Sequence, residues 1–261
     1  MLTKLPRTTR TVRLSSVRAV LFVELGLTVL VQIAIVLFDG FDNLDAVGPF
    51  EVFGHARARG ADIEVGLYTL DGQTPVVSGH GLAVQSDGVL PVPGPETGNG
   101  NGTADDGGAS TDRSGTDEGA GDRLPDLVVV PGGGWVDTAE TGVRAAVEDR
   151  LPGALARLHE RGVTVASVCT GGMILAAAGL TDGRPAVTHH GAIEDLRASG
   201  ADVVDARVID DGDIVTADGV TSGLDLALYL LEREFGPELA ADVAETMAHE
   251  RRGPVSTPGD R

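Results

Sequence analysis

The chain is poor in several residue types, and each scarcity argues against a class of protein. A single cysteine in 261 residues cannot form an internal disulfide, so nothing indicates an oxidising compartment. The six histidines show no HExxH or other metal-binding spacing, and we expect no metal and no cofactor. No Gly-x-Ser-x-Gly motif occurs, which excludes the usual serine nucleophile elbow. The only lysine, Lys4, does not follow a glycine-rich turn, which excludes a phosphate-binding loop.

Basic residues are also scarce, and the formal net charge is -19. Residues 1–30 hold five basic residues and one acidic residue, so their net charge of +4 leaves -23 for residues 31–261. Acidic residues spread along the chain in this way resemble the surfaces of haloarchaeal proteins, where high salt screens the repulsion. The alternative is an ordinary acidic cytosolic protein. In either case we expect a cytoplasmic location, and nucleic acid is a poor partner.

Residues 1–30 form a distinct segment, with spaced arginines followed by apolar residues. Residues 19–38 are long and apolar enough to be taken for a signal sequence or a membrane span, but Glu24 and Gln32 interrupt them. Residues 31–38 are typical of the first buried strand of an α/β domain. We therefore expect an N-terminal extension from an over-long translational start, with a membrane anchor as the alternative.

The rest of the chain alternates between strand and helix patterns, which predicts an α/β fold with a mostly parallel sheet. We expect one domain over residues 31–252, a disordered glycine- and aspartate-rich insertion at 94–123, and a tail at 253–261. Apolar runs predict strands at 31–38, 62–70, 126–130, 163–168 and 186–188, and hairpins at 75–77 with 82–85 and at 203–208 with 214–217. Helices are expected at 141–161, 173–178, 190–199 and 237–249. We expect two more: one with Pro49 in its first turn that ends at Gly60, and one capped by Ser222 that ends at 235.

The single cysteine, Cys169, lies between a buried-strand pattern and a helix pattern. A sharp strand-turn-helix elbow exposes its central side chain and needs small neighbours, which Ser167 and Gly171 supply. The N–H groups of a helix N-terminus stabilise a thiolate, so we expect a lowered pKa and a reactive sulfur. The alternative is a small residue of the core.

Other candidate site residues follow predicted strands. Asp45 lies just past the carboxyl end of the first strand, where sites assemble in open parallel sheets, although it could instead cap a helix. The glycine-rich turn before Trp135 exposes N–H groups that could stabilise an anion. His189 or His190 could be a base or only a solvated side chain. Trp135, Phe41 and His190 could close a pocket, but Trp135 could equally fill the core.

Four motifs together resemble the ThiJ/PfpI superfamily, which has a class I glutamine amidotransferase-like, flavodoxin-type fold with three layers. The motifs are Val-Cys-Thr-Gly-Gly at 168–172, Pro-Gly-Gly at 131–133, Leu-Asp-Ala-Val-Gly-Pro at 44–49 and Thr-Ala-Asp-Gly-Val-Thr-Ser-Gly-Leu-Asp-Leu-Ala-Leu at 216–228. The resemblance implies that Cys169 is the elbow nucleophile and that Asp45 approaches it. It also implies an oxyanion-type hole from the Gly133 and Thr170 N–H groups, and a homodimer.

Departures from the superfamily's branches narrow the expected activity. No histidine here has a glutamate two positions later, as glutamine amidotransferases require, and Thr170 stands where the peptidase branch has histidine. Asp45 stands where deglycases and glyoxalases have glutamate. Asp45, Cys169 and Thr170 most resemble isonitrile hydratase, a lyase acting on a small electrophile. The alternatives are a glyoxalase or deglycase acting on aldehydes, and a non-enzymatic redox or ligand sensor like the ligand-binding halves of certain transcriptional activators.

Overall fold

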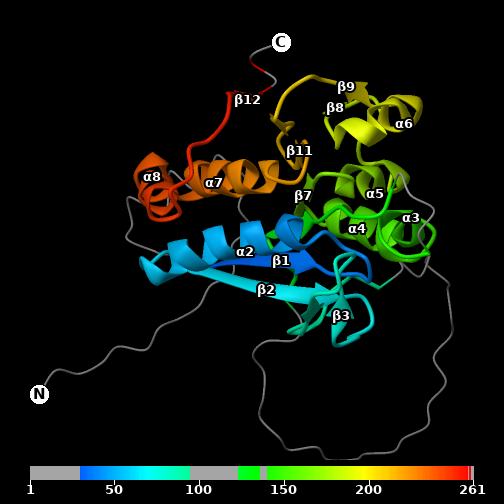
Figure 1. The fold of residues 1–261 in the computed structure, drawn as a ribbon, viewed down its shortest axis with the longest axis horizontal. Coiled ribbons are helices and arrows are strands. Elements are labelled where there is room, and N and C mark those ends of the chain that lie inside the picture. The colour runs from blue at the N-terminus through cyan, green and yellow to red at the C-terminus, as the bar shows by residue number, and fades with distance from the viewer. Residues whose placement is uncertain (1–29, 95–122, 136–139, 258, 260–261) are drawn as a thin grey trace, which may run out of the picture.

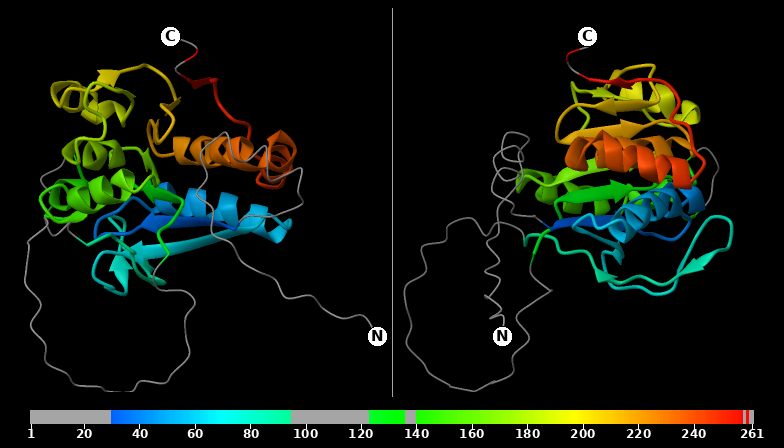
Figure 2. Two further views of the ribbon diagram at one scale, coloured as in Figure 1. Left: turned by 180° about the vertical axis from the view of Figure 1, so that it is seen from behind. Right: turned by 90° about the vertical axis from the view of Figure 1, so that its left-hand side faces the viewer.

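A computed structural model describes residues 30–94, 123–135, 140–257 and 259. The predicted extension at 1–30 and the predicted insertion at 94–123 therefore lie almost entirely outside the described residues. The described chain forms an eight-stranded sheet between two layers of helices (Figures 1 and 2). Across the sheet the strands are ordered β12 (Val255–Ser256), β10 (Val208–Asp210), β11 (Ile214–Ala217), β7 (Thr164–Val168), β6 (Leu127–Val130), β1 (Val31–Val36), β2 (Ile63–Thr69) and β5 (Gly88–Val89).

The central strands are parallel and buried on both faces. All four residues of β6 and the last four of β7 are buried, as their runs of apolar and small side chains predict for a sheet covered on both sides. The one antiparallel pair of this sheet is β10 with β11. The predicted α/β class with a mostly parallel sheet is confirmed, and the arrangement is that of a flavodoxin-like sandwich.

Each face of the sheet carries its own helices and its own apolar core. On one face lie α2 (Asn43–Ala58), α7 (Ser222–Phe235) and α8 (Pro237–Thr246). On the other lie α3 (Val143–Ala146), α4 (Leu151–Glu160), α5 (Gly171–Ala177) and, after a 3₁₀ turn at His190–Ala192, α6 (Ile193–Ala198). Because α2 and α5 cover opposite faces but both begin at the carboxyl ends of strands, their first residues meet at one edge of the sheet.

Two predicted helices differ from the structure at a proline. The helix expected over 141–161 is two helices, and the second begins with Pro152 in its first turn, where a missing N–H breaks no hydrogen bond. Pro49 lies inside α2 and not in its first turn, because the helix begins earlier, at Asn43. Gly60 follows the end of α2 with φ of 92°, as expected of a terminating glycine.

The C-terminal third also differs from the prediction. The hairpin partner of β11 is Val208–Asp210 and not 203–208, because β9 (Asp202–Val203) pairs with β8 (Pro185–Ala186) in a separate sheet. The hydroxyl of Ser222 donates to the carbonyl of Asp218 and does not cap α7. The segment expected as a tail supplies edge strand β12, paired with β10.

Two further short strands pack against the core under α2 through Val76 and Val84. The hairpin expected near residues 75–85 is present as β3 (Val76–Val77) and β4 (Ala83–Val84). Among the described helices, none is long and apolar enough to cross a membrane.

Candidate functional site

Cys169 sits on a strained elbow between β7 and α5. Its φ is 57°, a left-handed value that is uncommon for a residue with a side chain. Its N–H donates to the carbonyls of Ala217 and Asp218, at 3.1 and 2.9 Å, and its own carbonyl accepts from the Thr188 hydroxyl at 2.8 Å. Contacts on both sides of the residue therefore hold the backbone in this conformation, and the predicted elbow is present.

Close packing around the elbow explains the small residue after it. A Cβ atom on Gly171 would lie 2.4 Å from the carbonyl oxygen of Val130, so a larger residue would push α5 away from the neighbouring strand. Cys169 itself is only 5% exposed. The sulfur thus lies in a nearly closed position at the carboxyl edge of the sheet.

Asp45 approaches this sulfur from the first turn of α2. Its side chain is fully buried, and its Oδ2 accepts the N–H of Gly132 at 2.9 Å. Its other oxygen, Oδ1, is buried with no hydrogen-bond partner among the described residues, and its charge acts on the Cys169 thiol. The carboxylate that caps α2 belongs to Asp42, which accepts the N–H of Leu44 at 3.3 Å. The alternative reading of Asp45 as the helix cap is therefore wrong, and its carboxyl group is available to the cysteine.

Burial changes the protonation of both groups. Loss of water, together with the charge of Asp42, raises the pKa of Asp45 to about 8, although the Gly132 N–H opposes this. Burial also raises the pKa of the Cys169 thiol well above its ordinary value, and the Asp45 charge adds to this effect. The prediction of a lowered cysteine pKa is wrong, because one N–H from Thr170 and a short helix do not offset desolvation and a carboxylate.

Thr170 and the glycine-rich turn form the third side of the site. The Thr170 N–H lowers the pKa of the Cys169 thiol, while the Thr170 hydroxyl accepts the N–H of Gly133 at 2.9 Å. A Cβ atom on Gly132 would lie 2.7 Å from both the N and Oγ1 of Thr170 and 2.8 Å from Oδ2 of Asp45. The expected amides are thus brought to the site, with that of Gly133 engaged by the Thr170 hydroxyl.

The two histidines lie beside the elbow. His189 is half-buried; its Nδ1 accepts the N–H of Gly191 at 3.1 Å, which places the proton of the neutral ring on Nε2. A Cβ atom on Gly219 would lie 3.3 Å from the His189 ring, so the ring packs beside the loop that receives the Cys169 N–H. Burial and the adjacent His190, whose ring is 4.0 Å away, lower the pKa of His189. His190 is exposed.

Trp135 and Phe41 lie in different environments. Trp135 is half-buried, its indole N–H donates to Asp195 at 2.7 Å, and Arg144 lies 4.7 Å over its ring. Trp135 is therefore fixed to α6 through its indole N–H and also packs against the core of that face. Phe41 is fully buried within the core under α2 and serves packing.

Asp42 was missed by the reasoning from sequence. Its charge acts on Asp45, Cys169 and His189. Its N–H donates to the carbonyl of Gly132 at 2.8 Å, so the same glycine joins both aspartates. The signal was present in the sequence, since an aspartate just before a helix pattern is a typical cap. Among the described residues, no cluster of three or more potential ligands could hold a metal ion.

Comparisons with known proteins agree with this geometry. The model of the DJ-1/PfpI family matches residues 31–233, and the chain belongs to that family. It is 32% identical to "Isonitrile hydratase" of Pseudomonas putida over 209 residues, covering 80% of this chain and 74% of the relative. It is 31% identical to "Deglycase PH1704" of Pyrococcus horikoshii over 110 residues, covering 42% of this chain and 60% of the relative.

Solved structures agree as well. A THiJ/PfpI family protein from Pseudomonas syringae superposes with a TM-score of 0.66 at 25% identity, covering 87% of this chain and 78% of that one.

Proposed function

We propose that this member of the DJ-1/PfpI family is a cysteine-dependent lyase of the isonitrile hydratase type. It would add water to an isonitrile and release an N-substituted formamide, with no cofactor. The observation that carries the proposal is the fully buried Asp45 carboxyl group, which acts on Cys169 and whose Oδ1 has no hydrogen-bond partner among the described residues, with Thr170 beside it. The similarity to the Pseudomonas putida hydratase supports the choice of substrate class.

The protonation of the pair fits the first step of such a reaction. With its pKa raised to about 8, Asp45 is mostly protonated at neutral pH and can act as an acid. As the Cys169 sulfur bonds to the isonitrile carbon, Asp45 donates its proton to that carbon and takes up the thiol proton in exchange. The product of this step is a neutral thioimidate, so no charge is left in a site that disfavours charge.

The second step releases the product. Water adds to the thioimidate carbon while Asp45 accepts a proton from it and passes a proton to the nitrogen. The carbon–sulfur bond then breaks, the sulfur regains its proton, and the formamide leaves. The Thr170 N–H and hydroxyl would stabilise charge that develops during these steps, and the Gly133 N–H would act through the hydroxyl that it already contacts.

A second candidate is a deglycase or glyoxalase activity, which the similarity to the Pyrococcus horikoshii protein favours. The same thiol would then attack the carbonyl carbon of an aldehyde. His189 and His190, which lie beside the elbow, would be pocket residues in either case.

A panel of electrophiles tests the proposal. We expect cyclohexyl isocyanide to be converted to its formamide by the wild type at molar KCl, and not by Cys169→Ser. Lactate formation from methylglyoxal without isonitrile turnover would favour the second candidate. Peroxide oxidation of Cys169 to the sulfinic acid, with no turnover of any electrophile, would replace both by the sensor.

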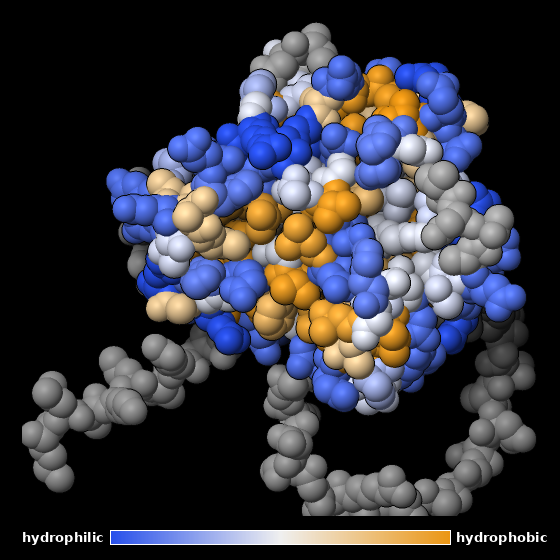
Figure 3. Space-filling view, in the orientation of Figure 1, coloured by the Kyte–Doolittle hydropathy of each residue, from blue (hydrophilic) through white to orange (hydrophobic). Residues whose placement is uncertain are grey.

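We also propose a homodimer that covers the face beside the site. Four large apolar side chains on this face are more than a third exposed: Leu44 (36%), Val47 (38%), Val77 (43%) and Leu82 (44%). Figure 3 shows hydrophobic residues gathered where α2 and the β3 hairpin lie. Such exposure on a monomer marks an interaction surface. Light scattering of the wild type and of Val47→Asp tests it, and we expect the variant to be monomeric.

A further inference from the structure

A cavity of about 690 Å³ opens at the amino ends of the central strands, at the opposite edge of the sheet from Cys169. Its walls come from β1, β6, α2 and α7, and they include four side chains of the core: Ile33, Phe53, Leu127 and Leu230. Its volume falls within the roughly 300–1,000 Å³ range of small-molecule sites. Partly buried apolar side chains in the lining, Val92, Leu124 and Phe235, offer surface for a hydrocarbon group.

The mouth of the cavity is basic, in contrast to the chain as a whole. Three arginines line it, Arg123, Arg161 and Arg233, against two acidic residues, Asp126 and Glu234. Both acids are already paired, Asp126 with Arg123 at 3.0 Å and Glu234 with Arg233 at 2.9 Å. Arg233 is also paired with Asp210, at 3.2 Å, and arginines outnumber carboxylates among the lining residues of a chain whose net charge is -19.

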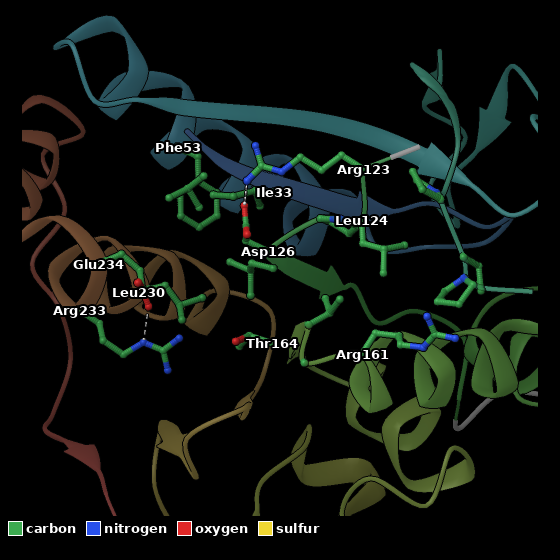
Figure 4. Close-up of a pocket in the computed structure, with 18 of the residues that line it drawn as sticks. Ile33, Phe53, Arg123, Leu124, Asp126, Arg161, Thr164, Leu230, Arg233 and Glu234 are labelled. Atoms are coloured by element: carbon green, nitrogen blue, oxygen red, sulfur yellow. Dashed lines mark hydrogen bonds and ion pairs between the residues drawn. The ribbon is translucent and has the colours of Figure 1, made fainter. Parts of the chain in front are cut away.

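Arg123 is held in place for a further contact. Its Nη2 donates to the carbonyl of Leu30 and to Asp126, both at 3.0 Å. A guanidinium has five N–H donors, and Nε and Nη1 have no partner among the described residues, so they can meet a ligand oxygen. In Figure 4 the Arg123 side chain extends across the cavity toward Ile33 and Phe53, and Arg233 approaches from the opposite side.

We propose that this cavity binds a small anion with a hydrocarbon body, such as a medium-chain carboxylate. The hydrocarbon would lie against Leu124 and Phe235, which line the cavity and are only partly buried, and the carboxylate would accept hydrogen bonds from Arg123. This site is separate from the Cys169 site, and its existence does not depend on the proposed lyase activity.

Calorimetry of the folded full chain with three ligands of one chain length tests the proposal. Octanoate should bind saturably at one site per chain, octanol at least about tenfold more weakly because it lacks the charge, and octyltrimethylammonium without saturation. Absence of saturable octanoate binding, or equal binding of the ammonium compound, would overturn the proposal.

Variants locate the binding. Arg123→Gln should weaken octanoate binding about tenfold, whereas Arg197→Gln, on the exposed surface of α6, should leave it unchanged. Octanoate should not slow alkylation of Cys169. Equal affinity in both variants, or protection of Cys169 by octanoate, would place the ligand elsewhere and refute the site.

Discussion

Ionisable groups lie in opposite environments at the two edges of the same sheet. At the carboxyl edge, Asp45 is fully buried and Cys169 is 5% exposed, and no arginine pairs with either among the contacts of the described chain. At the amino edge, Asp126 and Glu234 line an open cavity, and each is paired with an arginine. Burial without an arginine partner shifts the pKa values of Asp45 and Cys169, which suits proton transfer. Pairing with arginine keeps Asp126 and Glu234 ionised, which suits binding.

The difference follows from packing. Around Cys169, glycines let the backbone come so close that a single Cβ at Gly132 would contact both Thr170 and Asp45. At the amino edge, the strands end and the segments around them enclose an open cavity. The following predictions separate the two edges, beginning with the largest expected effect.

Cys169→Ala should reduce isonitrile turnover by about 10³-fold or more, because the reaction loses its nucleophile. Octanoate binding at the amino edge should be unchanged. Formamide production is measured by NMR and octanoate binding by calorimetry; a loss of both in a variant that still melts cooperatively would show that the two edges are not independent.

Asp45→Asn should reduce turnover by about 10²- to 10⁴-fold, the usual contribution of a general acid-base. The control is Asp62→Asn, on the exposed surface before β2, which should retain full activity. In the wild type, activity should fall as the pH rises through about 8, because Asp45 loses its proton there. A rate that is flat to pH 10 would argue against Asp45 as the acid.

The same carboxyl group should make stability depend on pH. Because its folded-state pKa is raised to about 8 from 3.8, the folded chain holds a proton that the unfolded chain has lost between about pH 4 and 8. This part of the free energy of unfolding therefore falls as the pH rises through that window. Denaturant melts of Asp45→Asn should show a weaker decline than the wild type, and identical declines would contradict the burial of an ionisable group.

Gly132→Ala should destabilise the chain by about 1–3 kcal/mol and reduce turnover, since the added carbon overlaps Thr170 and Asp45. Gly54→Ala is the matched control, because nothing lies within 4 Å of its Cβ position in α2. It should stabilise the chain by about 0.5–1 kcal/mol. Chemical denaturation measures both, and an equal response of the two variants would mean that the site is not tightly packed.

Asp42→Asn should move the high-pH limb of activity to lower pH, because the charge of Asp42 helps to keep Asp45 protonated. Asparagine remains a good helix cap, so the melting temperature should change little. The pH dependence of turnover measures the shift, and a limb that stays in place would remove Asp42 from the account.

Added KCl should raise the melting temperature modestly, because salt screens repulsion within a chain of net charge -19. Melting curves between low and molar KCl measure it. No rise in melting temperature over that range would contradict the expected adaptation to high salt.

The sequence predicted the parts of the fold that depend on local pattern. Apolar runs predicted the central strands, and the small residues around Cys169 predicted the elbow. Each of these patterns is contained within a few consecutive residues. The helix break before Pro152 and the pairing of β8 with β9 depend on contacts between distant segments, which the local pattern does not contain.

The site was predicted in part for the same reason. The meeting of Asp45 with Cys169 followed from a resemblance and from the common edge of parallel strands. The raised pKa of Cys169 did not follow, because it depends on complete burial beside a carboxyl group and outweighs the helix N-terminus that the sequence suggested. The cavity at the amino edge arises where several chain segments end, and no local motif marks it.

The central claim is that Asp45 and Cys169 form one coupled pair, and the pH dependence of Cys169 alkylation tests it most directly. Alkylation by iodoacetamide can be followed by mass spectrometry in the wild type and in Asp45→Asn. Because the Asp45 charge resists thiolate formation, the account predicts that alkylation of Asp45→Asn begins at a lower pH than that of the wild type. Superimposable profiles would contradict it.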